Sequence, residues 1–346
     1  MVPVVDCQQN PLMPCSEKRA RKMILTRKAT PFWKHGMFCV RLNVEPSGRA
    51  TQDIVVGIDP GSKKEGLTVK SAAHTLLNIQ ADAVTWVKDA VEGRRNARKA
   101  RRGRNTPCRQ PRFNRARGGL PPSTKARWQW KLRMCAWLAK MYPVTGFVVE
   151  DIAAMTKKGK RKWNVRFSPL EVGKAWFYEQ LRLLGTVDLK QGWETKGLRD
   201  AVGLKKTKRK MADVFAAHCV DSWVLANWKV GGHTLPEYTR MLRVVPLQFH
   251  RRQLHYFQPA KGGKRKPYGG TRSLGFKRGS LVRHPKWGLC YVGGTMKDRI
   301  TMHELLSGKR LTQLAKPAET HFLTYNTWRT ALLPVLKGGV SAPEIR

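Results

Sequence analysis

The spacing of apolar and polar positions predicts that the chain is built from three parts. The first fifty residues predict a small unit with a basic helix, capped by Ser16, and a strand at residues 37–44. Three apolar runs then follow with short connections, at residues 53–61, 66–71 and 75–86. Strands in this order fit an antiparallel start to a mixed sheet.

The central part predicts further helices and a second buried strand. Residues 123–142 predict a helix, and residues 144–152 predict an apolar strand that ends in a carboxylate. A capping box with Ser168 and Glu171 predicts that a second helix starts there. Residues 210–228 predict a third helix. The pattern indicates an α/β fold.

After about residue 243 the pattern changes to a glycine- and lysine-rich loop and then to short strands. Residues 279–295 predict a hairpin, and residues 299–302 and 320–325 predict further strands. We expect a small β-rich domain of barrel type with basic loops.

Residues 94–117 contain ten arginines and no carboxylate. The first half of this tract has a helix-compatible composition, but its apolar residues, Ala97 and Ala100, are small. Such a helix cannot bury a face against a core and needs another partner. A disordered basic arm is the alternative, and the central position of the tract favours a helix held between nucleic acid and protein.

Charge narrows the choice of partner. The chain has 67 Lys and Arg against 23 Asp and Glu, a formal net charge of +44. A compact protein with this excess repels itself unless a polyanion neutralises it, which favours nucleic acid over the alternative of a merely basic soluble protein. We expect no membrane partner and a cytosolic protein, since long apolar runs and a signal-peptide layout are lacking. The seven cysteines are scattered without a C-x-x-C pair, so no zinc ribbon is predicted.

Three carboxylates lie where a buried metal site would need them. Asp59 ends the first strand, Glu150 ends the strand of residues 144–152, and Asp221 lies on the third helix, one turn after His218. An acid at a buried strand end is costly unless it is paired or binds metal. Oxygen ligands suit Mg²⁺ or Mn²⁺, and two such ions about 3.5–4 Å apart can promote phosphodiester cleavage.

Each residue also has an ordinary structural role open to it. Asp59 could form the turn before Pro60, Glu150 could pair with an arginine, and His218 could be a packed core histidine. Their occurrence together, in this order, favours a nuclease site. A phosphate-binding Walker loop is excluded because Ser62 stands where that motif needs its second glycine.

Several motifs resemble those of RNA-guided nucleases. The segments "GIDPGSKKEG", "FVVEDI" and "HCVD" resemble the three split RuvC motifs, and the arginine tract resembles the bridge helix. "NPLMP" resembles the signature of the N-terminal PLMP domain of the transposon-encoded IscB group. An HNH nuclease insert separates the last two RuvC motifs in IscB, but residues 151–217 here contain no histidine and no cysteine. The chain is therefore similar to the IsrB family, the relatives of IscB that lack HNH.

The resemblance implies a ribonuclease-H-like (RuvC) mixed sheet, split by the arginine-rich bridge helix. It implies that Asp59, Glu150 and Asp221 bind two Mg²⁺ ions and that His218 acts near the phosphate. It also implies a monomeric, cytoplasmic and nucleoid-associated prokaryotic ribonucleoprotein. Its long guide (omega) RNA pairs with one strand of a double-stranded DNA target beside a short adjacent motif. The RuvC site would cut only the other strand, the non-target strand, and leave a nick.

The resemblance also assigns nucleic-acid contacts and domain limits. The expected contacts are Arg94, Arg95, Arg98, Arg101, Arg102, Arg104, Arg109 and Arg112 of the tract, with Lys264, Arg265, Lys266, Arg272, Lys277 and Arg278 of the terminal domain. For the last six, a solvated basic loop is the alternative. The implied domains are PLMP (1–52), RuvC I (53–87), bridge helix and arm (88–117), RuvC II and III (118–243), and a β-rich domain that reads the target-adjacent motif (244–346).

Two other functions fit parts of this pattern. One is a guide-independent nuclease with the same fold, such as a junction resolvase, although such an enzyme needs neither the arginine tract nor the appended domains. The other is a non-catalytic RNA-binding protein, which the net charge allows. The three carboxylates argue against it, because carboxylates without metal repel RNA.

Overall fold

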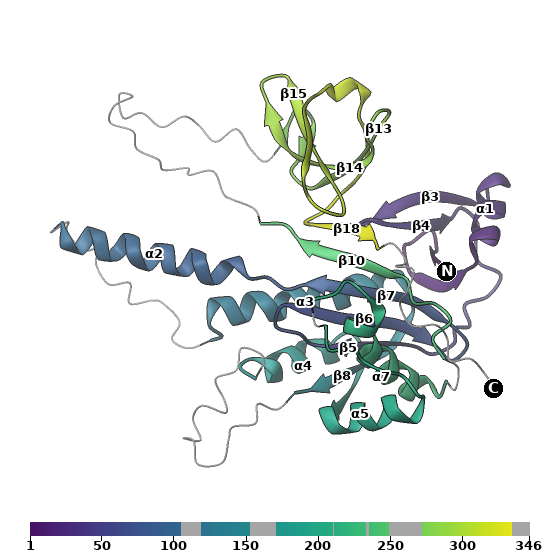
Figure 1. The fold of residues 1–346 in the computed structure, drawn as a ribbon. Coiled ribbons are helices and arrows are strands. Elements are labelled where there is room, and N and C mark those ends of the chain that lie inside the picture. The colour runs from purple at the N-terminus through teal and green to yellow at the C-terminus, as the bar shows by residue number, and fades with distance from the viewer. Residues whose placement is uncertain (105–118, 153–170, 210, 233–234, 249–271, 334–346) are drawn as a thin grey trace, which may run out of the picture.

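The structure is a computed structural model that describes residues 1–104, 119–152, 171–209, 211–232, 235–248 and 272–333. It contains three main sheets (Figure 1). None of the helices in these ranges is long and apolar enough to cross a membrane.

The N-terminal unit is a four-stranded sheet with one helix. The strand order is β2-β1-β4-β3. The elements are β1 (Val2–Val5), β2 (Pro11–Cys15), α1 (Glu17–Leu25), β3 (Ala29–Lys34) and β4 (Met37–Leu42). The predicted cap is confirmed, because the backbone N–H of Arg19 donates to Ser16 Oγ at 3.3 Å. "NPLMP" contributes most of β2, which the pattern of apolar residues did not predict.

The central sheet has seven strands in the order β18-β10-β7-β6-β5-β8-β9. These are β5 (Ile54–Asp59), β6 (Lys64–Ser71), β7 (Thr75–Asp82), β8 (Val144–Asp151), β9 (Thr186–Gln191), β10 (Met241–Pro246) and β18 (Trp328–Leu332). The predicted antiparallel meander is confirmed in β5, β6 and β7. Strands β8 and β9 then extend the sheet in parallel from β5.

Helices cover both faces of this sheet (Figure 1). They are α3 (Pro122–Met141), α4 (Lys174–Arg182), α5 (Gly192–Ala201), α6 (Phe215–His218) and α7 (Val220–Val230). A further helix, α2 (Trp86–Gly103), projects away from the sheet. Strand residues Ile54, Val56 and Ile58 pack in the main core with α3 and α4, whereas Val55 packs against Leu225 of α7. A large mixed sheet between two helical layers, begun by a meander and continued in parallel, fits a ribonuclease-H-like fold.

The stretch between Glu150 and Asp221 contains two elements beyond the helices that the sequence predicts there. Strand β9 and helix α5 both lie there, and neither was predicted. Helix α4 begins at Lys174, after Gly173 in a left-handed conformation (φ 89°), so the predicted start at the capping box is wrong. Glu171 instead pairs with Lys174 at 3.0 Å, and Ser168 lies outside the described residues.

The C-terminal part forms a five-stranded antiparallel sheet in the order β16-β15-β14-β13-β17. Its strands are β13 (Ser280–His284), β14 (Gly288–Met296), β15 (Arg299–Glu304), β16 (Arg310–Ala315) and β17 (His321–Tyr325), with a 3₁₀ turn at Pro317–Glu319 and a small hairpin of β11 (Arg272–Ser273) and β12 (Phe276–Lys277). The predicted hairpin at 279–295 is confirmed. The predicted limit at residue 244 does not match the sheets, because β10 crosses it and β18 returns to the central sheet.

Candidate active site

Strand register places the first two acids side by side. In the parallel pair β5–β8, Ile58 lies opposite Val149. Asp59, the last residue of β5, and Glu150, the last but one of β8, therefore lie side by side. Side chains alternate between the two faces of a strand. Because Val55 and Val148 face α7, the same alternation turns Asp59 and Glu150 toward α7. The two carboxylates therefore meet on one face at one end of the sheet.

Two glycines let the third acid approach. A Cβ at Gly57 of β5 would lie 1.8 Å from the carbonyl oxygen of Ser222, and one at Gly66 of β6 would lie 1.7 Å from that of His218. Only glycine leaves room for the helical backbone to touch these strands. This close contact carries Asp221, at the start of α7, to the ends of β5 and β8.

The three carboxylates form one cluster. One oxygen atom from each of Asp59, Glu150 and Asp221 can be chosen so that all three lie within 4.8 Å of one another. Burial, together with the charges of Asp59 and Asp221, raises the pKa of Glu150 to about 8. Three acids held this close require a proton or a cation to compensate their charge. A donor set made only of carboxylate oxygens fits a hard divalent ion such as Mg²⁺ or Mn²⁺.

Two cationic side chains supply part of that compensation. Lys206 Nζ lies 3.1 Å from Asp59 Oδ2 and also contacts Asp221 Oδ2. Arg199 Nη1 donates to Asp221 Oδ1 at 2.7 Å. Although burial opposes it, the two aspartates raise the pKa of Lys206 well above its ordinary value. The sequence did not predict a role for Arg199 or Lys206. Lys206 lies in the run "LKKTKRK", where nothing distinguishes it from the neighbouring basic residues.

His218 occupies a different position from the one predicted. The predicted third helix breaks at Cys219, so His218 ends α6 and Asp221 starts α7, and the two do not share one continuous helical face. The His218 side chain is buried, and its Nε2 atom has no hydrogen-bond partner. Burial and the nearby Lys64 charge lower its pKa, against the opposing charges of Asp59 and Asp213. The neutral imidazole of His218 is thus favoured more than that of a free histidine.

A buried ion pair supports the turn that follows Asp59. Lys131 Nζ of α3 lies 2.9 Å from Glu65 Oε2 of β6, and both side chains are almost fully buried. Lys131 also lies 3.5 Å from the carbonyl oxygen of Gly61, in the turn itself. Burial raises the pKa of Glu65, and the charge of Lys131 opposes that rise. The pair connects α3 to the β5–β6 turn on the face of the sheet opposite α7.

The predicted nucleic-acid contacts that fall within the described residues lie apart from the cluster. On α2 the arginines from Arg94 to Arg104 are exposed, and the helix extends away from the sheet with no fully buried residue (Figure 1). The predicted helix is therefore present, and it begins at Trp86. In the C-terminal part Arg272 and Arg278 are exposed, while Lys277 Nζ lies 5.0 Å from the ring centroid of Tyr325. Arg109, Arg112, Lys264, Arg265 and Lys266 lie outside the described residues.

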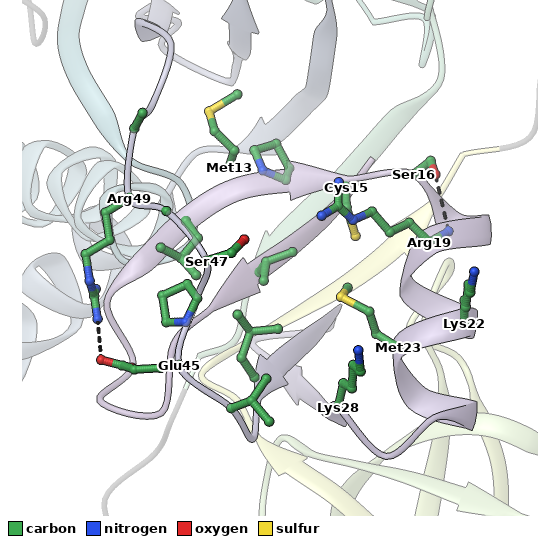
Figure 2. Close-up of a pocket in the computed structure, with 18 of the residues that line it drawn as sticks. Met13, Cys15, Ser16, Arg19, Lys22, Met23, Lys28, Glu45, Ser47 and Arg49 are labelled. Atoms are coloured by element: carbon green, nitrogen blue, oxygen red, sulfur yellow. Dashed lines mark hydrogen bonds and ion pairs between the residues drawn. The ribbon is translucent and has the colours of Figure 1, made fainter.

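A second basic feature is a pocket in the N-terminal unit. It has a volume of about 740 Å³ and lies between α1 and the segment of residues 42–50 (Figure 2). Arg19, Lys22 and Lys28 are among its lining residues, with apolar contributions from Met13 and Met23. Its cationic rim adds to the positive surface of the chain, outside the acid cluster.

With a divalent ion held by the carboxylates, the ion and Lys206 would together offer positive charge to a phosphate diester. The acids form a small negative site inside a chain of net charge +44. A polyanion would not approach bare carboxylates, but it would approach carboxylates neutralised by cations.

Comparison with known proteins gives one family match and distant matches among solved structures. A family model described as "RRXRR protein" matches residues 2–163, which include Asp59, the arginine tract and Glu150. Among solved structures, RuvC of T. thermophilus in complex with a Holliday junction substrate is similar at 13% identity and a TM-score of 0.28, covering 51% of this chain and 90% of that chain. A CRISPR-Cas12f ternary complex is similar at 13% identity and a TM-score of 0.29, covering 61% of this chain and 48% of that chain. No curated protein matches the sequence.

Proposed function

We propose that the protein is an RNA-guided, divalent-metal-dependent DNA endonuclease of the RuvC type that nicks the non-target strand. The observation that carries the proposal is the cluster of Asp59, Glu150 and Asp221, brought within 4.8 Å from three distant segments. Carboxylates collected at one end of a sheet, in a chain that otherwise repels cations, need a specific reason to be there. Metal-dependent phosphodiester hydrolysis supplies that reason.

Asp59, Glu150 and Asp221 would hold the divalent metal, which we expect to be Mg²⁺, with Mn²⁺ as a substitute. A bound ion stabilises the developing negative charge and makes water more acidic. Lys206 and Arg199 contribute positive charge at the same place, next to the oxygens of Asp59 and Asp221. His218 keeps a neutral imidazole nearby that can accept or donate a proton during hydrolysis.

A long guide RNA is the proposed partner of the arginine-rich helix α2. The last ten residues of α2 include five arginines and bury no side chain against a core, and guanidinium groups match phosphate geometry with paired donors. The net charge of +44 calls for many phosphates, more than one scissile position provides. The proposed RNA is the omega RNA of the IsrB family, and the C-terminal sheet would read the short target-adjacent motif.

We infer that one strand is cut, because the described residues contain one candidate metal cluster and each strand needs a nuclease site to cut it. The segment 151–217, where IscB carries its second nuclease, contains no histidine and no cysteine. Within it the described residues include β9 of the central sheet and the helices α4 and α5, which contact β9. The proposed product is therefore a nick.

The experiment is to purify the protein with its bound RNA, to sequence that RNA, and to supply a matching duplex labelled on both strands. We expect one defined long RNA and Mg²⁺-dependent cleavage of the non-target strand. Asp59→Ala should abolish cleavage and keep the RNA, while Asp298→Asn, at an exposed carboxylate in the C-terminal sheet, should change neither.

Other results would refute specific parts of the proposal. Equal cutting of both strands would refute nicking. Cleavage of branched DNA without any defined RNA would indicate a guide-independent resolvase-type enzyme. Bound RNA without metal-dependent cleavage of any DNA would indicate a non-catalytic RNA-binding protein.

A further inference from the structure

Trp193 is an exposed tryptophan placed next to the acid cluster. It lies in the first turn of α5 and is 76% exposed. The preceding residue, Gly192, is adjacent to the metal site, since a Cβ built on it would lie 3.5 Å from Glu150 Oε1. An indole is the largest apolar side chain, and leaving it in water forgoes much favourable burial. Its exposure beside a catalytic cluster therefore needs an explanation.

Packing of α5 does not require this side chain. The helix is fixed to the rest of the molecule by the buried Thr195, by the partly buried Leu198, and by Arg199, which reaches Asp221. Its N-terminus is closed by a capping box between Gln191 and Glu194. Trp193 thus lies on the side of α5 that faces solvent, and the fold holds the helix without it.

The residue that follows Trp193, Glu194, takes part in a contact between α5 and α7. Lys190 of β9 lies opposite Glu150 in the strand register. Its Nζ atom is 3.0 Å from Glu194 Oε1 and 4.1 Å from the ring centroid of Trp228 on α7. Trp228 is itself 40% exposed. Lys190 therefore connects the first turn of α5 to α7 on the same side of the sheet as the acids.

We propose that Trp193 is a stacking platform for a nucleobase of the DNA strand whose phosphate lies at the acid cluster. The inference rests on the proposed nuclease function. A single strand combines a negative backbone with apolar base faces. Lys206 and Arg199 at the acid cluster offer positive charge to the backbone, and the exposed indole of Trp193 offers an apolar face to a base. Stacking is tolerant of sequence, which suits an enzyme that takes its specificity from base pairing. A stacked base beside the cluster would hold the adjoining phosphodiester in register with the carboxylates.

The test uses the purified ribonucleoprotein carrying Asp59→Ala, so that bound DNA is not cut. The probe is a single-stranded DNA oligonucleotide with one fluorescent purine analogue, whose emission is quenched when the base stacks. We expect quenching at one position of the analogue. Trp193→Ala should abolish it and weaken binding about tenfold. Trp193→Phe, which keeps an aromatic face, should retain part of the quenching, and Leu183→Ala, a similarly exposed apolar residue (77%) on α4, should change nothing.

Cleavage kinetics give a second readout in the otherwise native protein. Trp193→Ala should raise the KM for the nicked strand or lower kcat through misplacement, with Trp193→Phe in between. Unchanged affinity and unchanged quenching in Trp193→Ala would overturn the inference. So would a Trp193→Ala variant that binds DNA normally but no longer retains a protein that co-purifies with the unmodified chain, because Trp193 would then bind a protein. If the unmodified protein cleaves no DNA with any divalent metal, the proposed function fails, and the quenching assay still decides whether Trp193 stacks on a base.

Discussion

Glu150→Gln tests the electrostatics of the acid cluster in the absence of metal. In the folded protein, burial and the charges of Asp59 and Asp221 raise the pKa of Glu150 from 4.5 to about 8. Between these two values the folded chain binds a proton that the unfolded chain has released. Stability contributed by this group is therefore fully present at low pH and is lost as the pH rises through the folded pKa.

The size of the effect follows from the shift. One pKa unit corresponds to about 1.4 kcal/mol, so ionised Glu150 would cost at most about 5 kcal/mol at high pH. The side chain is only partly buried, and Lys206 lowers the cost through its own charge. We therefore expect metal-free Glu150→Gln to be more stable than the unmodified protein by about 2 kcal/mol at about pH 9, and by much less at about pH 6.

The assay is thermal and denaturant unfolding of the metal-free protein at the two pH values. Glu179→Gln, at an exposed carboxylate on α4, serves as the control and should behave like the unmodified protein at both. Adding Mg²⁺ should make the unmodified protein more stable than Glu150→Gln, because the ion stabilises the protein that keeps all three carboxylates. If Glu150→Gln were destabilised at high pH without metal, the reasoning about crowded acids would be refuted.

Two further substitutions test how the site is held. Gly57→Ala places a Cβ 1.8 Å from a carbonyl oxygen of α7 and should destabilise the protein by about 3 kcal/mol or more, whereas Gly48→Ala, with nothing within 4 Å, should change stability by less than about 0.5 kcal/mol. Equal melting temperatures for these two variants would refute the close packing of α7. Lys131→Met leaves Glu65 buried and unpaired and should cost about 3–5 kcal/mol in denaturant unfolding. The double change Lys131→Met with Glu65→Leu should recover much of that loss, and a double variant as unstable as the single one would contradict the pairing.

Strong local patterns let the sequence predict the meander, helix α3 and the strands that end in Asp59 and Glu150. Both β5 and β8 are apolar and buried on both faces, so their limits and their terminal acids are visible in the sequence. The cap at Ser16 is equally local. By contrast, β9 lies at the edge of the sheet, where none of its side chains is fully buried, and its pattern is correspondingly weak.

Long-range contacts explain most of what the sequence did not predict. Strand β10 pairs with β7 and with β18, and no local pattern identifies partners so far apart in the chain. The break at Cys219 depends on backbone contact with glycines in β5 and β6, which a helical periodicity cannot reveal. Lys206 could not be predicted for a different reason: it contacts two acids of the cluster, but nothing in the sequence distinguishes it among 67 basic residues.

The central claim is that Asp59, Glu150 and Asp221 form the metal site that cleaves DNA. The most direct measurement is the rate of cleavage of end-labelled DNA by the purified ribonucleoprotein as a function of Mn²⁺ concentration, for the unmodified protein and for Asp59→Asn. The account predicts saturable, Mn²⁺-dependent cutting of one strand that Asp59→Asn loses while its RNA and DNA binding persist. Equal, Mn²⁺-dependent cutting by both proteins would contradict it.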